Sequence, residues 1–565
     1  MAVKNVKNVE KAKEEKELLP QEVYREFQAI VGPEHVTTDS VICQAYNARG
    51  YAREQISFLG LCTRPACVIL PKNTDEVARI VRVCNRNQVP YVPASTMWVI
   101  QACPRFRDDF VLIDLKRMDK MEIDEKNMIA VVEPAVIYGQ LLEEAMRKDM
   151  YTLVPGGGSQ AAVIANHLHY GICPLCYRIP LSDYRMNAAE WVTPEGEVVR
   201  MGSCVVDDKS WFWQDGLGPN AMGLLRGHIG WYGSLGVVTK MSVKLYPFQP
   251  QRMEPAGRSP ETHSKLPSSR MRFYNFTLPN REALVTAMDE ISRAQIGAAI
   301  TKVPVFWRVI AKSQDRNDFW DEWEKVTKEE IADTHILRIL LIGYTSQQQL
   351  EYEERVLTDI MNELGGTLRR TRQTDQSLLK FADSAGMWMM TGGYMSNTAG
   401  IDGRRICAKT GEMLGKKLEE YAPPLMPQYN DPGWFQSTDF GHQYYLEFLA
   451  YQDPDKLDPD SPKYRKEDIE KVYQWYMSAV PEIEVKTGFY NFFDGQHIPI
   501  RLKSPAWHNY DIWCDRFKAE FDPKGVGNPP MPFDIDELAE RHPEFITDEV
   551  KKAVGKVANL PRKGK

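Results

Sequence analysis

The sequence predicts an α+β fold with two domains. The chain has 565 residues, which is more than one hydrophobic core usually organises. Strand and helix patterns alternate from residue 20 to residue 245, and again after residue 268. Residues 247–267 between these regions are polar and rich in Pro, Ser, Arg and Glu, a composition typical of a linker. These observations indicate two layered domains joined by a connecting segment.

The first region begins with a predicted strand and a capped helix. Residues 65–71 are apolar, and Asn73 precedes an amphipathic run that ends near Asn87. Three further segments predict strands and a fourth predicts a helix, at 89–93, 110–115, 129–134 and 138–146. A glycine turn at 155–158 and an apolar strand at 237–240 complete the region.

The second region repeats the alternation. Its predicted strands and helices, in chain order, are 272–278, 281–295, 336–344 and 347–364. A loop rich in Asp and Pro at 453–462 precedes a predicted amphipathic helix at 466–478. The aromatic residues of this region suit a flat, apolar substrate, although a large hydrophobic core would use the same types; they are Trp388, Tyr394, Trp434, Phe435 and Tyr490.

Charge and composition exclude several classes of protein. The formal net charge is -7 and basic residues are scattered among acidic ones, so a nucleic-acid partner is not expected. No run of 18 apolar residues predicts a membrane span, and the charged N-terminus lacks the apolar centre of a secretory signal. We therefore expect a cytoplasmic protein.

The ten cysteines suggest no disulfide framework, and a reduced state accounts for them. Cys173 and Cys176 form a CxxC pair, which is compatible with redox chemistry, half of a metal site, or ordinary packing. No second CxxC follows at zinc-finger spacing, which favours packing.

The order of segments in the first region resembles the FAD-binding domain of the vanillyl-alcohol oxidase and p-cresol methylhydroxylase (PCMH) family of flavoproteins. The order runs from the strand at 65–71 through the turn at 155–158 to Gly230-x-x-Gly233-x-x-Gly236. Residues 273–279 are similar to the first cap strand of the para-phenol-oxidising branch, and residues 517–529 to the closing segment. The resemblance covers most of residues 20–530 and implies a PCMH-type FAD domain beneath an α/β cap (substrate) domain.

The resemblance also implies domain boundaries. In the family the chain returns from the cap to the FAD domain near its end. We therefore expect five parts: a charged N-terminal arm at 1–18, the FAD-binding domain at 19–247, the cap at 268–499, a return segment at 500–535 and a C-terminal tail at 536–565.

The glycine turn is the main candidate site for FAD. Backbone N–H groups can converge on a diphosphate where no side chain intervenes, and a nearby hydroxyl adds a donor. The predicted cofactor residues of this turn are Pro155, Gly156, Gly157, Gly158 and Ser159. An ordinary glycine turn is the alternative. The resemblance adds backbone contacts at Gly230, Gly233, Gly236 and Val238, where a strand would pass close to the cofactor.

The first diphosphate loop departs from the family pattern. The family carries several glycines there, whereas residues 94–103 of this chain contain none. Each added Cβ narrows the approach of backbone to phosphate. The loop has therefore changed shape, lost affinity or stopped binding diphosphate.

The resemblance places three catalytic candidates around the flavin. Asp183 matches an acidic residue of the aromatic-alcohol members and would handle a proton, although a loop or N-cap role is equally compatible with its position. His442 lies in a segment similar to the strand that bears a covalent flavin link, offset so that Tyr444 or Tyr445 falls at the expected place. Tyr490 matches the tyrosine of a phenolate-binding Tyr-Arg pair, but the Arg is missing, which weakens the case for a simple phenol.

The leading hypothesis is an FAD-dependent oxidoreductase, either an oxidase or a dehydrogenase, that moves a hydride between flavin N5 and a CH-OH or benzylic CH group. The glycine-free loop favours an alternative, a non-catalytic subunit that kept the fold and lost tight FAD binding. A non-redox flavoenzyme similar to the ether-lipid synthase would need a basic cluster in the cap, and the sequence indicates none. Expected partners are a small-molecule substrate, an electron-carrier protein and further copies of the chain.

Overall fold

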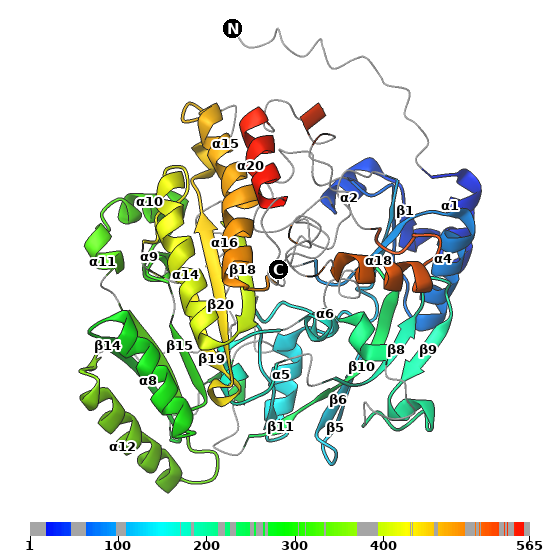
Figure 1. Cartoon of the computed structure of the whole chain (residues 1–565). Helices are drawn as coiled ribbons and strands as arrows, with labels where there is room; N and C mark the ends of the chain where they lie inside the picture. Colours follow the sequence, from blue (N-terminus) through cyan, green and yellow to red (C-terminus); the bar gives the residue numbers. More distant parts are fainter. Residues whose placement is uncertain are drawn as a thin grey trace.

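The computed structural model contains two domains that pack side by side (Figure 1). It describes residues 19–46, 64–97 and 109–248, the pairs 254–255 and 264–265, and residues 269–369, 394–491 and 503–558. Residues left out inside these ranges are 157, 170, 182–185, 213–220, 227–232, 303, 311, 333–334, 430, 432, 457–460, 504–507, 509, 530–535, 537–538 and 541–546. Within the described part, no helix is both long enough and apolar enough to cross a membrane.

The first domain opens with a small, mostly parallel sheet. Its strands, in spatial order, are β1 (Val36–Thr37), β2 (Cys67–Ile69), β4 (Val111–Asp114) and β3 (Tyr91–Ala94). Three helices belong to this part, α1 (Gln21–Val31), α2 (Ser40–Ala45) and α4 (Thr74–Asn87). The Asn73 side chain accepts a hydrogen bond from the backbone N–H of Glu76 at 2.9 Å, so it caps α4 as predicted.

A second, antiparallel sheet completes the first domain. Its strands, in spatial order, are β5 (Met121–Asp124), β6 (Ile129–Val132), β10 (Val237–Lys244), β8 (Met186–Val192) and β9 (Val198–Met201). The helices of this part are α5 (Tyr138–Arg147) and α6 (Val163–Leu168), and the short strands β7 (Met150–Tyr151) and β11 (Tyr246–Pro247) pair with each other.

The cap domain is built on a seven-stranded antiparallel sheet. Its strands, in spatial order, are β17 (Thr367–Leu368), β14 (Met271–Leu278), β16 (His335–Ile342), β15 (Ala299–Lys302), β19 (Trp434–Thr438), β20 (Gln443–Tyr451) and β18 (Tyr394–Asp402). Helices α8 (Arg281–Arg293), α12 (Gln347–Glu363) and α14 (Arg404–Leu418) contribute Met288, Leu357 and Cys407 to the core on one face, which we call the outer face. Side chains of the opposite, inner face share one core with the first domain.

The remaining helices lie around the cap and at the end of the chain. They are α9 (Phe306–Ile310), α10 (Arg316–Trp323), α11 (Lys328–Ala332), α15 (Lys466–Gln474), α16 (Val480–Thr487), α18 (Tyr510–Phe521) and α20 (Asp548–Ala558). A π-helical turn, Trp475–Ala479, joins α15 to α16, so the predicted helix at 466–478 continues past its expected end. Helix α20 packs on α15 and on this turn, with Val550 fully buried.

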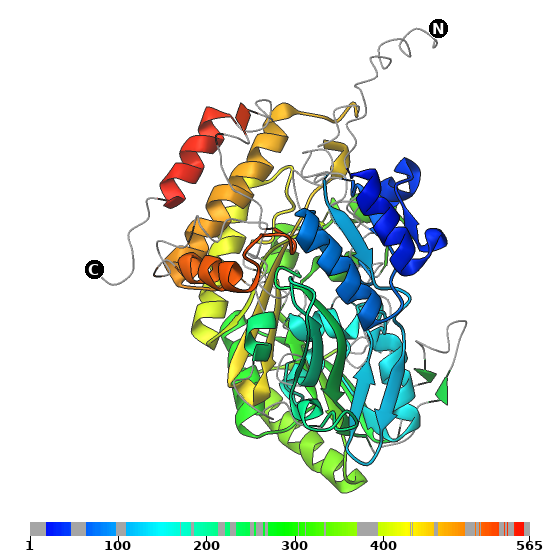
Figure 2. The same cartoon turned by 90° about the vertical axis from the view of Figure 1, so that its right-hand side faces the viewer.

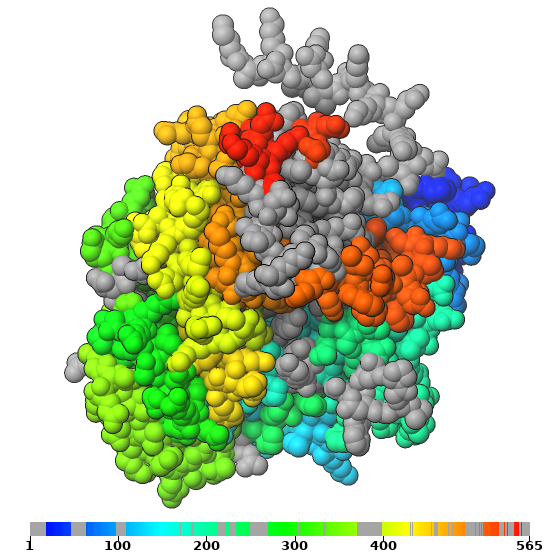
Figure 3. Space-filling view, viewed as in Figure 1, coloured from blue at the N-terminus to red at the C-terminus, as the bar shows by residue number. Residues whose placement is uncertain are grey.

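The chain returns to the first domain after the cap. Helix α18 lies over the first domain in Figure 1, and Figure 2 shows it from the side. The centroid of its Phe521 ring lies 5.8 Å from that of the Trp191 ring of β8. The backbone N–H of Tyr91 donates to the carbonyl of Val526 at 2.9 Å, and the N–H of Asn528 donates back to Tyr91 at 2.8 Å. Residues 526–528 therefore extend the edge of the first sheet at β3, and α18 forms part of the molecular surface there (Figure 3).

The predicted α+β fold with two domains is confirmed. The segment predicted as a linker contains strand β12 (Glu254–Pro255), which pairs with strand β13 (Ser264–Lys265). Each of these strands is only two residues long, which is too short for an alternating apolar pattern to show in the sequence.

Candidate functional site

A row of polar side chains crosses the inner face of the cap sheet. Strand register places Asn275 opposite Arg338, Arg338 opposite Thr301, Thr301 opposite Gln436, and Gln436 opposite Tyr445. Residues that face each other across neighbouring strands point to the same side of a sheet. These five residues, which we call the polar row, therefore line the face that packs toward the first domain.

The polar row holds the indole of Trp434 and joins the two domains. Trp434 Nε1 lies 2.9 Å from Thr301 Oγ1 and 3.0 Å from Gln436 Oε1, and it donates to both. Gln436 Nε2 donates to the backbone carbonyl of Cys173, in the first domain, at 2.7 Å. Trp434 and Gln436 are both buried, so these bonds form away from solvent and fix the cap sheet against the first domain.

A buried phenol and carboxylate lie at one end of the polar row. The Tyr445 hydroxyl donates to Glu447 Oε2 at 2.6 Å, and both side chains are buried. Burial and the neighbouring Glu447 carboxylate raise the pKa of Tyr445 well above its ordinary value. Tyr445 therefore stays protonated at neutral pH, with its hydroxyl proton donated to Glu447.

Arg338 is the cation of the polar row. The side chain is partly buried, and burial lowers its pKa to about 10, so the guanidinium is still charged at neutral pH. The sequence does not point to Arg338, because Arg338 lies far along the chain from Tyr490, where the arginine of a Tyr-Arg pair is expected. No spacing along the chain could have found it, since sheet pairing brings Arg338 beside Thr301.

The glycine turn faces the cap at Trp434. A Cβ added at Gly156 would overlap the far edge of the Trp434 ring. Gly158 has φ +106°, a left-handed conformation that favours glycine, and its N–H donates to the Pro155 carbonyl at 2.8 Å. The space beside Gly156 is therefore filled by the cap indole, and the predicted contact of Gly156 with the FAD diphosphate stays a prediction. Gly157 lies outside the described residues.

The residues after the turn fit FAD. Ser159 is buried, and its carbonyl accepts from the N–H of Gly139 at 2.9 Å. Gln160 Oε1 is buried and has no hydrogen-bond partner in the part of the chain that the structure describes. A buried acceptor without a donor is costly, and the ribityl hydroxyls and ring N–H of FAD are donors of the kind it needs. Gln160, Ser159 and Gly158 therefore fit the cofactor, and their contacts with FAD stay predictions.

The second predicted glycine segment is shaped by packing within the first domain. Gly233 and Gly236 have φ +72° and +105°. A Cβ at Gly233 would overlap Pro93, and one at Gly236 would overlap the Val192 carbonyl. Val238 is buried on β10, and Gly230 lies outside the described residues. Contacts of Gly233, Gly236 and Val238 with FAD stay predictions.

The glycine-free loop after β3 is described only as far as Met97. Met97 has φ +50°, so the backbone there is left-handed although the residue is not glycine. Such a conformation is uncommon for a side-chain-bearing residue and costs free energy. At Met97 the loop therefore adopts a backbone conformation that glycine usually adopts, although residues 94–103 contain no glycine.

The predicted catalytic residues are not all brought together. Asp183 lies outside the described residues, and its role stays a prediction. His442 is exposed in the turn Asp439–Gly441 and its C-cap, before β20. Tyr490 is partly buried against the core that also contains Trp434 and Tyr445, so it is the candidate that shares the inner-face environment.

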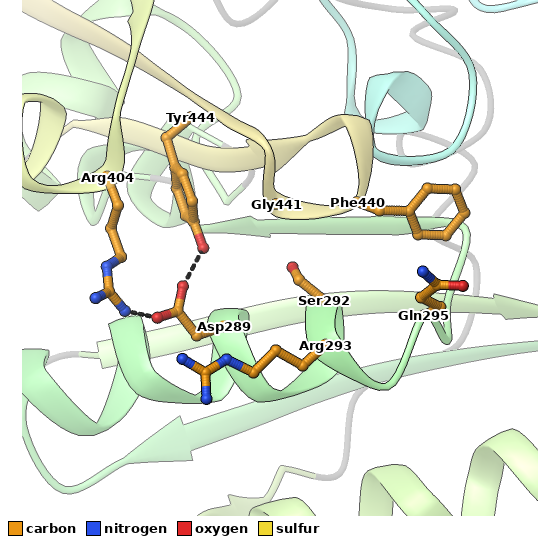
Figure 4. A pocket seen from close by; sticks show the side chains of 8 residues that line it. All are labelled: Asp289, Ser292, Arg293, Gln295, Arg404, Phe440, Gly441 and Tyr444. Carbon is orange, nitrogen blue, oxygen red and sulfur yellow. Dashed lines mark hydrogen bonds and ion pairs between the residues drawn. The ribbon is translucent and has the colours of Figure 1, made fainter.

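Tyr444 and Tyr445, the alternatives to His442, point to opposite faces of β20. Tyr445 belongs to the inner core, and Tyr444 to the outer core. The Tyr444 hydroxyl donates to Asp289 Oδ1 at 2.6 Å, and Asp289 also pairs with Arg404, at a separate pocket of about 480 Å³ on the outer face (Figure 4). Of the two tyrosines, only Tyr445 faces the first domain.

The CxxC pair is packed in the interior. Cys173 and Cys176 are buried free thiols, and the Cys173 N–H points at Cys176 Sγ at 3.4 Å. Among the described residues no group of three or more His, Cys, Asp or Glu side chains could hold a metal ion. These contacts favour the packing interpretation of the pair.

Residues 65–202 match the family described as an FAD binding domain. The chain is 29% identical over 189 residues to glycolate oxidase subunit GlcD of Bacillus subtilis, covering 32% of this chain and 37% of that protein. It is 23% identical over 358 residues to the flavoprotein subunit of 4-cresol dehydrogenase (hydroxylating) of Pseudomonas putida, covering 60% and 63%. These matches span about a third to three fifths of the relatives' lengths.

Solved structures match nearly the whole chain. p-Cresol methylhydroxylase superimposes with a TM-score of 0.66 at 17% identity, covering 90% of this chain and 96% of that one. 4-Ethylphenol oxidase of Gulosibacter chungangensis gives 0.65 at 18% identity, covering 90% and 96%. An alkyldihydroxyacetonephosphate synthase gives 0.61 at 15% identity, covering 91% and 86%. The two-domain fold is therefore the fold of these flavoproteins, and FAD is the cofactor that the matched domain binds.

Proposed function

We propose, from the premise that this chain is a PCMH-type FAD-binding flavoprotein of the vanillyl-alcohol oxidase and p-cresol methylhydroxylase family, that it is an FAD-dependent oxidoreductase. Its substrate is a small hydroxylated or aromatic organic molecule that binds beside the polar row at the inner face of the cap sheet. The observation that carries this proposal is the polar row itself: a buried sheet face that faces the cofactor domain and yet carries Arg338, Thr301, Gln436 and Tyr445.

Each residue has a role that follows from its chemistry. Arg338 orients a substrate oxygen that carries or develops negative charge, because a guanidinium in a half-dry site binds oxyanions strongly. The Tyr445–Glu447 pair holds or moves a proton at the Tyr445 hydroxyl. Trp434 and the neighbouring Trp307, whose ring centroid lies 5.7 Å away, exclude water. FAD supplies the hydride acceptor when it is bound.

The names of the relatives support an oxidoreductase without fixing the substrate. The names glycolate oxidase and 4-cresol dehydrogenase indicate a hydroxy acid and a phenol as the substrates of those two relatives. Glycolate carries a carboxylate and 4-cresol carries an ionisable phenol, so both substrates have an oxygen that can be anionic. A partner that accepts electrons is part of this proposal, because the 4-cresol relative is named as a flavoprotein subunit.

The decisive experiment is a visible absorbance spectrum of the purified protein before and after acid precipitation. We expect oxidised-flavin bands that bleach when a hydroxy acid or a para-alkylphenol is added without oxygen. Flavin retained in the precipitate would indicate a covalent link, with Tyr445 as the first residue to replace. Protein that takes up FAD but is not bleached by any compound of either class would contradict the proposal.

A second candidate function is a non-catalytic subunit that binds FAD weakly or not at all. The specific observation that favours it is that Gly156, Gly233 and Gly236 are each required by packing against protein atoms. These glycines would be retained even without a ligand. A colourless protein that fails to take up added FAD in the same experiment would support this second function over the first.

A further inference from the structure

Four buried side chains form a hydrogen-bonded group at the edge of the cap sheet. Glu484 Oε1 accepts from the Asn491 amide at 2.9 Å and from the Thr398 hydroxyl, and Glu484 Oε2 pairs with the ammonium of Lys503. The side chains of Glu484 and Lys503 are both 0% exposed. We call Thr398, Glu484, Asn491 and Lys503 the buried network.

The buried network joins segments that are far apart in the sequence. Thr398 lies on the edge strand β18, Glu484 on α16, and Asn491 just after that helix. Lys503 comes from the part of the chain expected to return to the first domain. Taking both charges of an ion pair out of water is costly, and apolar residues of similar size often serve stability as well. The buried charges of Glu484 and Lys503 are explained if this ion pair fixes one arrangement of the three segments.

The segment that the network fixes contains Tyr490. Asn491 Oδ1 accepts from the backbone N–H of Ala399 at 3.2 Å, and the carbonyl of Tyr490 lies where a side chain at Gly400 would stand. Phe489 is fully buried in the outer core, whereas Tyr490 packs against the inner core. The chain from 489 to 491 is thus pinned along β18, and its alternation turns the Tyr490 side chain toward the inner face.

We propose that Glu484 and Lys503 are positioning residues that hold Tyr490 at the substrate site of the inner face, where its phenol contacts the substrate. This inference rests on the proposed oxidoreductase function. The negative charge of Glu484 organises three donors at once, from Thr398, Asn491 and Lys503, so its loss releases the segment that carries Tyr490.

The test measures the environment of the Tyr490 side chain in the holoenzyme, with and without substrate. The first readout is the ¹⁹F spectrum of protein that carries 3-fluorotyrosine at position 490. We expect Glu484→Gln to shift or broaden this signal, and the control Asp522→Asn to leave it unchanged. Asp522 belongs to another buried ion pair, with Lys518 in the return segment, so the control loses a comparable buried charge elsewhere. An unchanged signal in Glu484→Gln would overturn the proposal.

The second readout is a kinetic double-mutant cycle. We expect Glu484→Gln to raise KM by roughly one order of magnitude, and to have little further effect on KM in a Tyr490→Phe background. If Glu484→Gln and Tyr490→Phe each raise KM by the same factor alone and in combination, Glu484 does not act through Tyr490. If Glu484→Gln does not fold, the variant Glu484→Gln with Lys503→Met removes both charges together and is tested in the same way. Absence of any flavin-dependent turnover would count against the proposed function, and the fluorine signal alone would then decide the positioning.

Discussion

At the scale of single residues, Gly156 is a position where the first domain and the cap are in direct contact. The Trp434 ring occupies the space that a side chain at 156 would need. The ring cannot retreat freely, because Thr301 and Gln436 both hold its Nε1. Because glycine has no Cβ, Trp434 can pack directly on residue 156, and the methyl group of an alanine there would prevent this contact.

We expect Gly156→Ala to lower the free energy of unfolding by about 1–3 kcal/mol through overpacking and to weaken FAD retention. Urea unfolding followed by fluorescence, with flavin content measured alongside, checks this. Adding Trp434→Phe should restore part of the loss, because phenylalanine lacks the ring atoms that collide. Gly223→Ala is the matched control, since no atom lies within 4 Å of a Cβ built there. Equal stability of Gly156→Ala and the control would refute the account.

Arg338 gives the second prediction at this scale. Replacing it with Met should weaken the binding of an oxyanion substrate or of an unreactive carboxylate by about tenfold or more, because a charged hydrogen bond contributes about 1.5–3 kcal/mol. Titration of the flavin spectrum with the carboxylate measures this. Arg272→Met on β14 is the control: Arg272 lies 3.7 Å from Glu354 of α12, on the other face of the sheet. Equal affinities in the two variants would remove Arg338 from the site.

At the scale of elements, Glu190 ties helix α4 to the second sheet of the first domain. The Thr74 hydroxyl, at the start of α4, donates to Glu190 Oε1 at 2.6 Å, and Arg200 Nε donates to Oε2 at 3.0 Å. Burial by itself raises the pKa of Glu190, but the bonds from Thr74 and Arg200 outweigh it, and the pKa is lowered from 4.5. A carboxylate with a lowered pKa stabilises the fold above its unfolded pKa and loses this contribution as pH falls.

We therefore expect Glu190→Gln to be less stable than the natural protein at pH 7, by about 1.5–3 kcal/mol, and the gap to shrink below pH 4.5. Urea unfolding of both proteins across that pH range measures the gap. The exposed Glu195→Gln is the control for loss of a charge in the same domain. A gap that stays constant as pH falls would show that ionisation of Glu190 contributes nothing.

Local signals in the sequence predicted many of these elements. Asn73 marked the start of α4, and apolar runs marked β2, β4 and β6. The turn at 155–158 is predicted to approach a diphosphate, and the contact that the structure shows there is with Trp434 of the cap. The polar row could not be found in this way, because its members are joined by strand register and come from five strands. The alternation of apolar and polar residues predicts which side chains of one strand share a face. It does not predict which residues of five different strands lie side by side.

At the scale of the whole molecule, the order of the segments and its resemblance to a known family predicted the two-domain fold. The contacts between the domains were not predicted, because no local sequence pattern marks the residues that make them. Arg178 of the first domain lies over the Tyr344 ring of the cap, with its Cζ 4.5 Å from the ring centroid. Arg178 Nη1 also donates to the Gly297 carbonyl at 3.3 Å, and the Tyr151 hydroxyl donates to the Tyr344 hydroxyl at 2.9 Å. These contacts fasten the first domain and the cap to each other.

A cofactor held between two domains leaves faster when the domains separate more often. Removing the guanidinium of Arg178 takes away a half-buried cation–π contact of about 1–2 kcal/mol. We therefore expect Arg178→Leu to speed FAD release about tenfold, since 1.4 kcal/mol corresponds to a factor of ten. The rise of flavin fluorescence after dilution measures this rate. Arg147→Leu on α5 is the control, because Arg147 pairs only with Glu144 of its own helix in the described structure. If both variants release FAD at the natural rate, the cofactor is held by the first domain alone, and the cap serves the substrate rather than the flavin.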